Sequence, residues 1–184
     1  MLDISPSELR PLRRVEYEDL ARMGHFEDEH VELLDGAIVR VSPTHPPHSG
    51  IVQRLTRVLV RALDESQATV RIQSPLALSS RSMPEPDVVV APPGDYLDAH
   101  PTEAWLIIEV AESSLRKDQV LKARLYAEAG VPEYWIVDVD ANVIEVRTGP
   151  VAGSYTRVEL HGKGVRLPLV RFPEVSLSTA AILR

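Results

Sequence analysis

The sequence contains no cysteine, so disulfide bonds and thiolate metal sites are both excluded. This absence suits a reducing compartment, and we expect a cytoplasmic protein. No apolar run approaches the roughly 18 residues that a membrane-spanning helix needs. Residues 1–8 also lack the basic start and apolar core of a signal peptide. The chain is therefore expected to have no association with a membrane.

Aromatic residues are scarce as well, at 5% of the chain. Glycosidases use paired carboxylates but usually also present aromatic platforms to the sugar, so this scarcity argues against that class of hydrolase. The sequence also has no glycine-rich phosphate loop, no His-x-x-x-His zinc pair and no Ser–His–Asp pattern. These absences remove several of the common catalytic arrangements.

Acidic residues exceed basic ones, and the formal net charge is −7. Proteins that bind nucleic acid usually carry a basic surface, so this balance argues mildly against such a partner. The argument is weak for a metal-dependent nuclease, because active-site acids cluster and a bound cation reverses their local charge. The net charge therefore leaves DNA open as a partner.

The length and composition indicate one globular domain. The chain has 184 residues, of which 44% are hydrophobic and 26% charged, and this is enough for a sizeable core. We expect a single restriction-endonuclease-like domain over residues 1–184, for reasons that the motifs below supply. Its core is expected over about residues 15–147, followed by a C-terminal β extension over residues 148–184.

The hydrophobic pattern predicts an α/β fold with a central mixed β-sheet flanked by helices. Helices are predicted over residues 15–23, 48–63 and 115–129, and strands over residues 30–34, 37–41, 69–73, 76–78, 88–91, 105–111, 134–139, 143–147, 155–160 and 165–170. Asp35-Gly36 is a strong signal for a two-residue hairpin turn, and the prolines within residues 42–47 predict a loop. The helix between strands 105–111 and 134–139 predicts a right-handed parallel crossover.

Two carboxylates stand in the most apolar part of the chain. Asp87 opens the run Val-Val-Val-Ala, and Glu109 lies inside Leu-Ile-Ile-Glu-Val-Ala. Such short runs predict strands that are buried on both faces. A carboxylate inside such a strand is costly unless a cation meets it, and two on adjacent strands would repel each other. A shared divalent cation is the simplest explanation, so we predict a metal site on the central sheet.

Several short motifs share an order and spacing with a known group of nucleases. They are residues 32–36 (Glu-Leu-Leu-Asp-Gly), Ser42-Pro43, His48, residues 84–87 (Pro-Glu-Pro-Asp), Glu109-Val110, Asp118, Lys122 and residues 130–138. In combination these motifs resemble the PD-(D/E)XK nuclease superfamily, and more narrowly the Uma-two family of restriction endonucleases. The resemblance covers roughly residues 15–147. It implies a restriction-endonuclease-like fold and a Mg²⁺-dependent DNA endonuclease, a hydrolase acting on phosphodiester bonds.

The resemblance also implies a metal site. Asp87 and Glu109 would be ligands of Mg²⁺, or of Mn²⁺ as a substitute, and the backbone carbonyl of Val110 would offer a third oxygen. Such an ion can activate water and neutralise the phosphate. Glu32 would belong to the same acidic cluster, as a ligand through water or as the partner of a lysine. The catalytic residues implied are therefore Glu32, Asp87, Glu109 and Lys122.

Two further residues are candidates for contact with phosphate or DNA. His48 lies near the start of a predicted helix, where phosphate binds well. Tyr126 lies four residues after Lys122 and continues the same helix face.

The lysine departs from the superfamily pattern. That pattern places a lysine two residues after the acid, a position that Ala111 occupies in this chain. In the family that the chain resembles, the lysine comes from the following helix, which fits Lys122. Since a lysine near the scissile phosphate stabilises developing charge, we predict that Lys122 is the catalytic lysine.

Several of these residues also have a purely structural interpretation. Asp87 is in a position common for a turn or strand start, Glu32 and Lys122 would be ordinary in solvent, and His48 could merely open its helix. The row Arg54, Arg57 and Arg61 is most simply a solvated helix face. The chain as a whole could be a non-catalytic DNA- or protein-binding module on a nuclease-like fold.

Because one site cuts one strand, cleavage of both strands favours a homodimer.

Overall fold

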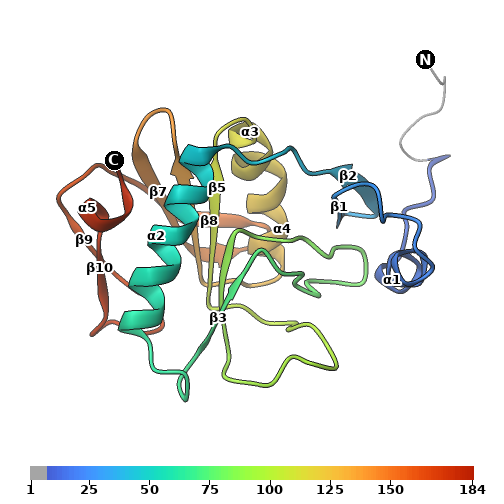
Figure 1. Ribbon diagram of the computed structural model, residues 1–184, viewed down its shortest axis with the longest axis horizontal. Coiled ribbons are helices and arrows are strands. Elements are labelled where there is room, and N and C mark those ends of the chain that lie inside the picture. Colours follow the sequence, from blue (N-terminus) through green and yellow to red (C-terminus); the bar gives the residue numbers. More distant parts are fainter. Residues whose placement is uncertain (1–7) are drawn as a thin grey trace.

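A six-stranded mixed sheet forms the centre of the protein in this computed structural model, which describes residues 8–184 (Figure 1). Its strand order is β3-β4-β5-β6-β7-β8, with β5 and β6 parallel and the other neighbours antiparallel. The strands are β3 Thr69–Ile72, β4 Val88–Ala91, β5 Leu106–Ala111, β6 Glu133–Asp138, β7 Val143–Val151 and β8 Ser154–His161. The predicted α/β fold with a mixed sheet is confirmed, as is the parallel pairing across the crossover.

The two acid-bearing strands lie in the middle of this sheet. Every residue of β4 and β5 is buried, as their unbroken apolar runs predict. The register pairs Val88 with Ile108, so continuing it by one residue places Asp87 opposite Glu109. The fold thus brings the two carboxylates side by side at one end of the sheet.

The predicted helix 115–129 is one continuous helical segment with an unusual middle. It consists of α3 Leu115–Lys117, the π-helical turn η2 Asp118–Lys122 and α4 Ala123–Glu128. Gly130 follows with a φ of 73°, which ends the segment as expected. The segment covers one face of the sheet through Ala123 and Tyr126. Its π turn carries Lys122 toward the end of β5.

The opposite face of the sheet is covered by α2, Pro46–Ala62, with α5 Thr179–Ile182 beside it (Figure 1). The apolar stripe of α2 includes Ile51, Leu55 and Leu59, and all three are in the larger hydrophobic core. The helix begins two residues before the predicted start, inside the expected proline loop. Prolines are tolerated there because the first turn of a helix leaves its N–H groups unpaired.

A small hairpin stands beside the sheet next to α1 Arg14–Arg22. Strands β1 Val31–Leu34 and β2 Ala37–Arg40 pair around Asp35 and Gly36, whose φ angles are 49° and 82°. Both central residues are left-handed, as a type I′ turn requires, so the predicted hairpin is confirmed. Gly36 also packs against Pro11, and a Cβ atom at Gly36 would lie 2.3 Å from Pro11 Cβ.

Two predicted strands differ from the structure. Residues 76–78 form no strand, because their amides donate to loop carbonyls: Leu76 N–H to Pro84 and Ala77 N–H to Pro101. The strand predicted over residues 165–170 is only β9 Arg166–Pro168, paired with β10 Ser176–Ser178 outside the main sheet. Within residues 8–184, no helix combines the length and hydrophobicity needed to cross a bilayer. Residues 1–7, predicted to carry no signal peptide, lie outside the described part.

Candidate active site

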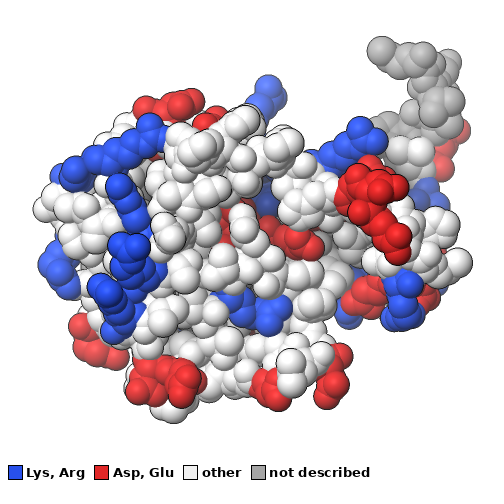
Figure 2. All heavy atoms as spheres, in the orientation of Figure 1, with Lys and Arg blue, Asp and Glu red and all other residues white. Residues whose placement is uncertain are grey.

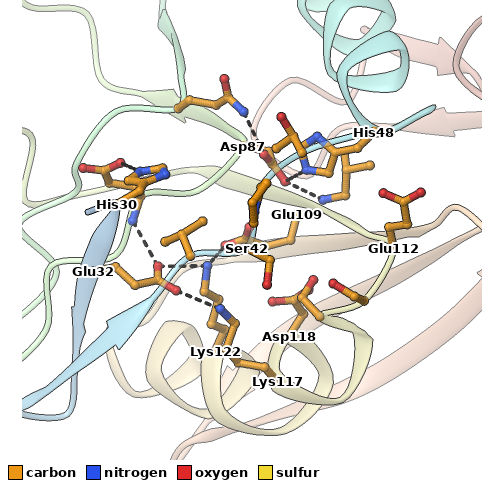
Figure 3. Close-up of a pocket in the computed structure, with 18 residues that line it drawn as sticks. His30, Glu32, Ser42, His48, Asp87, Glu109, Glu112, Lys117, Asp118 and Lys122 are labelled. Carbon is orange, nitrogen blue, oxygen red and sulfur yellow. Dashed lines mark hydrogen bonds and ion pairs between the residues drawn. The ribbon is translucent and has the colours of Figure 1, made fainter. Parts of the chain in front are cut away.

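A pocket of about 90 Å³ lies where the start of α2, the end of β5, hairpin β1–β2 and the π turn meet (Figure 3). That volume holds a few water molecules. Its lining carries six carboxylates, from Glu32, Glu85, Asp87, Glu109, Glu112 and Asp118. Only two lysines, Lys117 and Lys122, face them. The pocket therefore has a surplus of negative charge, which favours a cation.

Asp87 is held by the backbone of the neighbouring strand. Its Oδ2 accepts a 2.8 Å hydrogen bond from the Val110 N–H, which lies beyond the paired part of β4 and β5. The same oxygen lies 3.1 Å from His48 Nε2 on the first turns of α2. Burial opposes the charge of His48, but the hydrogen bond to Asp87 and the nearby carboxylates outweigh it and raise the pKa of His48.

Glu109 points from β5 toward the helical segment. Its Oε1 accepts hydrogen bonds from Lys122 Nζ at 2.9 Å and from the Tyr126 hydroxyl at 2.7 Å. Burial raises the pKa of Glu109 to about 8, against the pull of Lys122 and with the help of Asp118 and Asp87. Glu109 is therefore paired with a lysine of the chain itself. To bind an ion, Glu109 would use its other oxygen, Oε2, or Lys122 would have to move away from Oε1.

Glu32 joins two lysines at the pocket floor. Its Oε2 lies 3.1 Å from Lys122 Nζ, and its Oε1 lies 3.1 Å from Lys117 Nζ. Burial would raise the pKa of Glu32, but the two ammonium groups outweigh burial and lower it. The surrounding carboxylates likewise raise the pKa of Lys122 despite its burial. The Glu32–Lys122 pair is therefore ionised over the whole neutral range.

The π turn explains why both lysines reach Glu32. Residues five apart in an α-helix point about 140° away from each other. The wider π turn, whose bonds run from i to i+5, brings Lys117 and Lys122 to the same side. Lys117 was not among the predicted site residues, and an α-helix would place it on another face than Lys122.

Asp118, one of the motif residues, also lines the pocket, although it was not among the predicted site residues. Its side chain is 1% exposed, and Ser114 Oγ donates to its Oδ2. Its Oδ1 is buried, and none of residues 8–184 forms a hydrogen bond with it. Burial raises the pKa of Asp118, although Lys122 and Ser114 oppose this. A buried carboxylate oxygen without a partner is costly, so Asp118 Oδ1 is open to a ligand.

The predicted site residues mostly converge. Glu32, His48, Asp87, Glu109 and Lys122 all line the pocket. None of the purely solvated alternatives holds for Glu32 or Lys122, whose side chains are 1% and 5% exposed.

Val110 and Tyr126 have different positions relative to the pocket. Val110 lines it, so its carbonyl remains a candidate ion ligand. Tyr126 lies beneath it, is fully buried and donates to Glu109. That burial fits the positioning of Glu109 and does not fit the predicted contact with DNA.

The donor set suits a hard divalent cation. Within residues 8–184, no three His, Asp or Glu side chains are grouped as ready ligands of one ion. The pocket nevertheless gathers carboxylate oxygens from Asp87 and Glu109 and the unpaired Oδ1 of Asp118. Oxygen ligands of this kind are those that Mg²⁺ prefers. The types of ligand present therefore suit Mg²⁺.

Comparisons with known proteins agree with this description. The model of the Uma2 family, described as "Putative restriction endonuclease", matches residues 14–180. A crystal structure from Anabaena variabilis, described as a "putative nuclease belonging to DUF820", superposes with a TM-score of 0.72 at 18% identity. That similarity covers 94% of this chain and 97% of the other, and at this identity it shows the fold alone. No curated protein matches the chain.

Proposed function

This chain belongs to the Uma2 family, and on that premise we propose that it is a Mg²⁺-dependent endonuclease that hydrolyses phosphodiester bonds of DNA. The family and the fold are those of nucleases, and the divalent ion and the DNA substrate are the proposal. The observation that carries it is the pocket, where buried Asp87 and Glu109 lie next to a buried lysine, Lys122.

The ion would be held by Asp87, Glu109 and the carbonyl of Val110, with Mn²⁺ able to replace Mg²⁺. When bound, such an ion neutralises phosphate charge and lowers the pKa of a bound water. The orphaned Oδ1 of Asp118 supports the proposal, because a cation would satisfy it. In the absence of an ion, the Val110 N–H and His48 keep Asp87 oriented toward the pocket.

Lys122 supplies fixed positive charge at the pocket floor. Glu32 holds its ammonium group at 3.1 Å, and that salt bridge places the charge beside Glu109. A charge placed in advance stabilises the phosphorane-like transition state without the cost of reorganising water. Lys117, on the more exposed side of Glu32, adds a second positive charge toward the pocket mouth.

His48 is proposed to contact the phosphate. Its ring lines the pocket from the first turn of α2. Its raised pKa increases the fraction that is protonated near neutral pH. A charged imidazole beside Asp87 can donate to a phosphate oxygen.

The direct test is cleavage of supercoiled plasmid with Mg²⁺ or Mn²⁺. Wild type should nick or cut it, and Asp87→Asn should not exceed background. Asp140→Asn, an exposed acid in the turn between β6 and β7, is the matched control and should cut like wild type. If wild type binds DNA but cuts nothing with either ion, the chain is instead the non-catalytic binding module.

We also propose that the protein is a homodimer, because one pocket per chain cuts one strand. The free edge of β8 offers an interface, since Val158 and Leu160 on it are 52% and 68% exposed. Sedimentation should show a dimer at micromolar concentration. Monomer alone, with and without DNA, would contradict this part of the proposal.

A further inference from the structure

Helix α2 is basic in an acidic protein. Its 17 residues contain Arg54, Arg57 and Arg61 and no Asp or Glu, although the chain carries a net charge of −7. The three arginines are spaced by three and four residues, so they share one face. That face is opposite the stripe of Ile51, Leu55 and Leu59, and all three arginines are exposed.

Two of these arginines have no partner in the described part of the chain. Arg57 and Arg61 form no hydrogen bond or ion pair with any of residues 8–184. Arg22 and Arg40, which are also exposed, each pair with a carboxylate. Arg54 differs because it donates to the carbonyls of Ile182 and Leu183 and so holds the C-terminal segment. Arg57 and Arg61 are therefore free to bind an external anion.

The basic face and the pocket open on the same side of the molecule. Figure 2 shows blue side chains along α2 and red side chains in the hollow at the centre of the same view. His48, on the first turns of α2, lines the pocket. Arg57 and Arg61 follow it by 9 and 13 residues, or roughly 14 and 20 Å along the helix axis at 1.5 Å per residue. A rise of 20 Å corresponds to about six phosphates of one DNA strand.

We propose that Arg57 and Arg61, the arginine ridge, bind the phosphate backbone of DNA on its way to the pocket. This inference rests on the proposed function and specifies how the substrate is held. The pocket carries six carboxylates against two lysines. Without a bound cation it therefore repels the phosphates of DNA. Affinity for the polymer must then come from a basic surface elsewhere, and the unpaired arginines of α2 provide it.

The experiment compares Arg57→Ala/Arg61→Ala with Arg22→Ala/Lys163→Ala. The second variant removes the same charge from two exposed residues, one on α1 and one in the turn after β8. Arg54 is left intact because of its bonds to the C-terminal segment. Binding of a fluorescent duplex of about 20 base pairs is measured with CaCl₂ at increasing salt, since each phosphate contact contributes about 0.9 to the slope of log K against log salt.

The ridge variant should bind more weakly, with a slope smaller by about 2. The ratio of wild-type to variant affinity should then fall about tenfold between roughly 50 and 200 mM salt. Hydrolysis of bis(4-nitrophenyl) phosphate, which is too small to reach Arg57 or Arg61 from the pocket, should be unchanged. The control variant should resemble wild type in both assays.

Three results would overturn the inference. If the ridge variant binds DNA with wild-type affinity and salt dependence, the ridge does not bind DNA, and the nuclease proposal is unaffected. An equal loss in the control variant would mean that only net charge matters. Failure of wild type to bind DNA at all would contradict both the ridge and the proposed substrate.

Discussion

Replacing Glu109 by Gln should stabilise the metal-free protein at alkaline pH. Burial raises the pKa of Glu109 from 4.5 to about 8. Below pH 4.5 the folded and unfolded chains both hold this proton. Between pH 4.5 and 8 only the folded chain keeps it, so rising pH favours unfolding. The pKa of Lys122 is raised above its ordinary value. Lys122 therefore stays charged throughout this range and does not contribute to the pH dependence of the free energy of unfolding.

The size of the effect follows from the pKa difference. One retained proton lowers the free energy of unfolding by about 1.4 kcal/mol per pH unit. From pH 4.5 to 8 this amounts to roughly 5 kcal/mol. Glutamine keeps an acceptor for the Tyr126 hydroxyl but has no proton to lose, so this slope should vanish in the variant.

The assay is urea unfolding of metal-free protein at several pH values between about 6 and 8. The quantity compared is the difference between variant and wild type, because it cancels the pH dependence of the groups that the substitution leaves unchanged. The gap should widen by about 1.4 kcal/mol per pH unit. Glu159→Gln, an exposed acid on β8, is the control and should follow wild type. Parallel profiles for wild type and Glu109→Gln would refute the raised pKa.

Lys122→Ala should reduce DNA cleavage about 10²–10³-fold while circular dichroism shows a retained fold, since Glu32 keeps Lys117 as a partner; cleavage at the wild-type rate would remove Lys122 from catalysis. Adding Ala111→Lys to that variant should restore part of the rate, because Ala111 and Glu109 point to the same face of β5. Gly36→Ala should lower the unfolding free energy by more than about 1 kcal/mol, because its φ is +82° and the new Cβ would overlap Pro11. Gly162→Ala is the control, because an added Cβ there would meet no atom within 4 Å apart from its chain neighbours. Equal melting temperatures for the two variants would contradict this account.

The parts of the fold that local chemistry determines were predictable. Asp35-Gly36 specifies its hairpin because few other pairs adopt two left-handed conformations in sequence. The strands around Asp87 and Glu109 were predictable from unbroken apolar runs, which only a doubly covered strand can bury. The helix of residues 46–62 followed from its apolar stripe, with only its start displaced.

Features that depend on tertiary context were not predictable. Residues 76–78 have a strand-like composition, but their backbone N–H groups donate to loop carbonyls instead of to a neighbouring strand. The π turn at Asp118–Lys122 has no sequence signal, and a regular α-helix would place Lys117 on another face than Lys122. The short pair β9–β10 is held mainly by packing of Leu167, Leu169 and Leu177 into the larger core.

The charge balance of the site illustrates the same limit. Sequence reasoning required a cation for the buried carboxylates and predicted a metal ion shared by Asp87 and Glu109. In the structure Lys122 meets Glu109, and His48 with the Val110 N–H meets Asp87. The need for positive charge was foreseen, but its first source is the chain itself. The divalent ion stays a prediction, supported by the surplus of carboxylates and by the unpaired Asp118 Oδ1.

Calorimetric titration with Mn²⁺ tests the central claim most directly. Wild type should bind Mn²⁺, and Asp87→Asn should bind it far more weakly, because a neutral amide replaces one carboxylate ligand while keeping an acceptor for the Val110 N–H. Asp140→Asn should bind like wild type. Equal Mn²⁺ binding by wild type and Asp87→Asn would contradict a divalent-cation site at the end of β5.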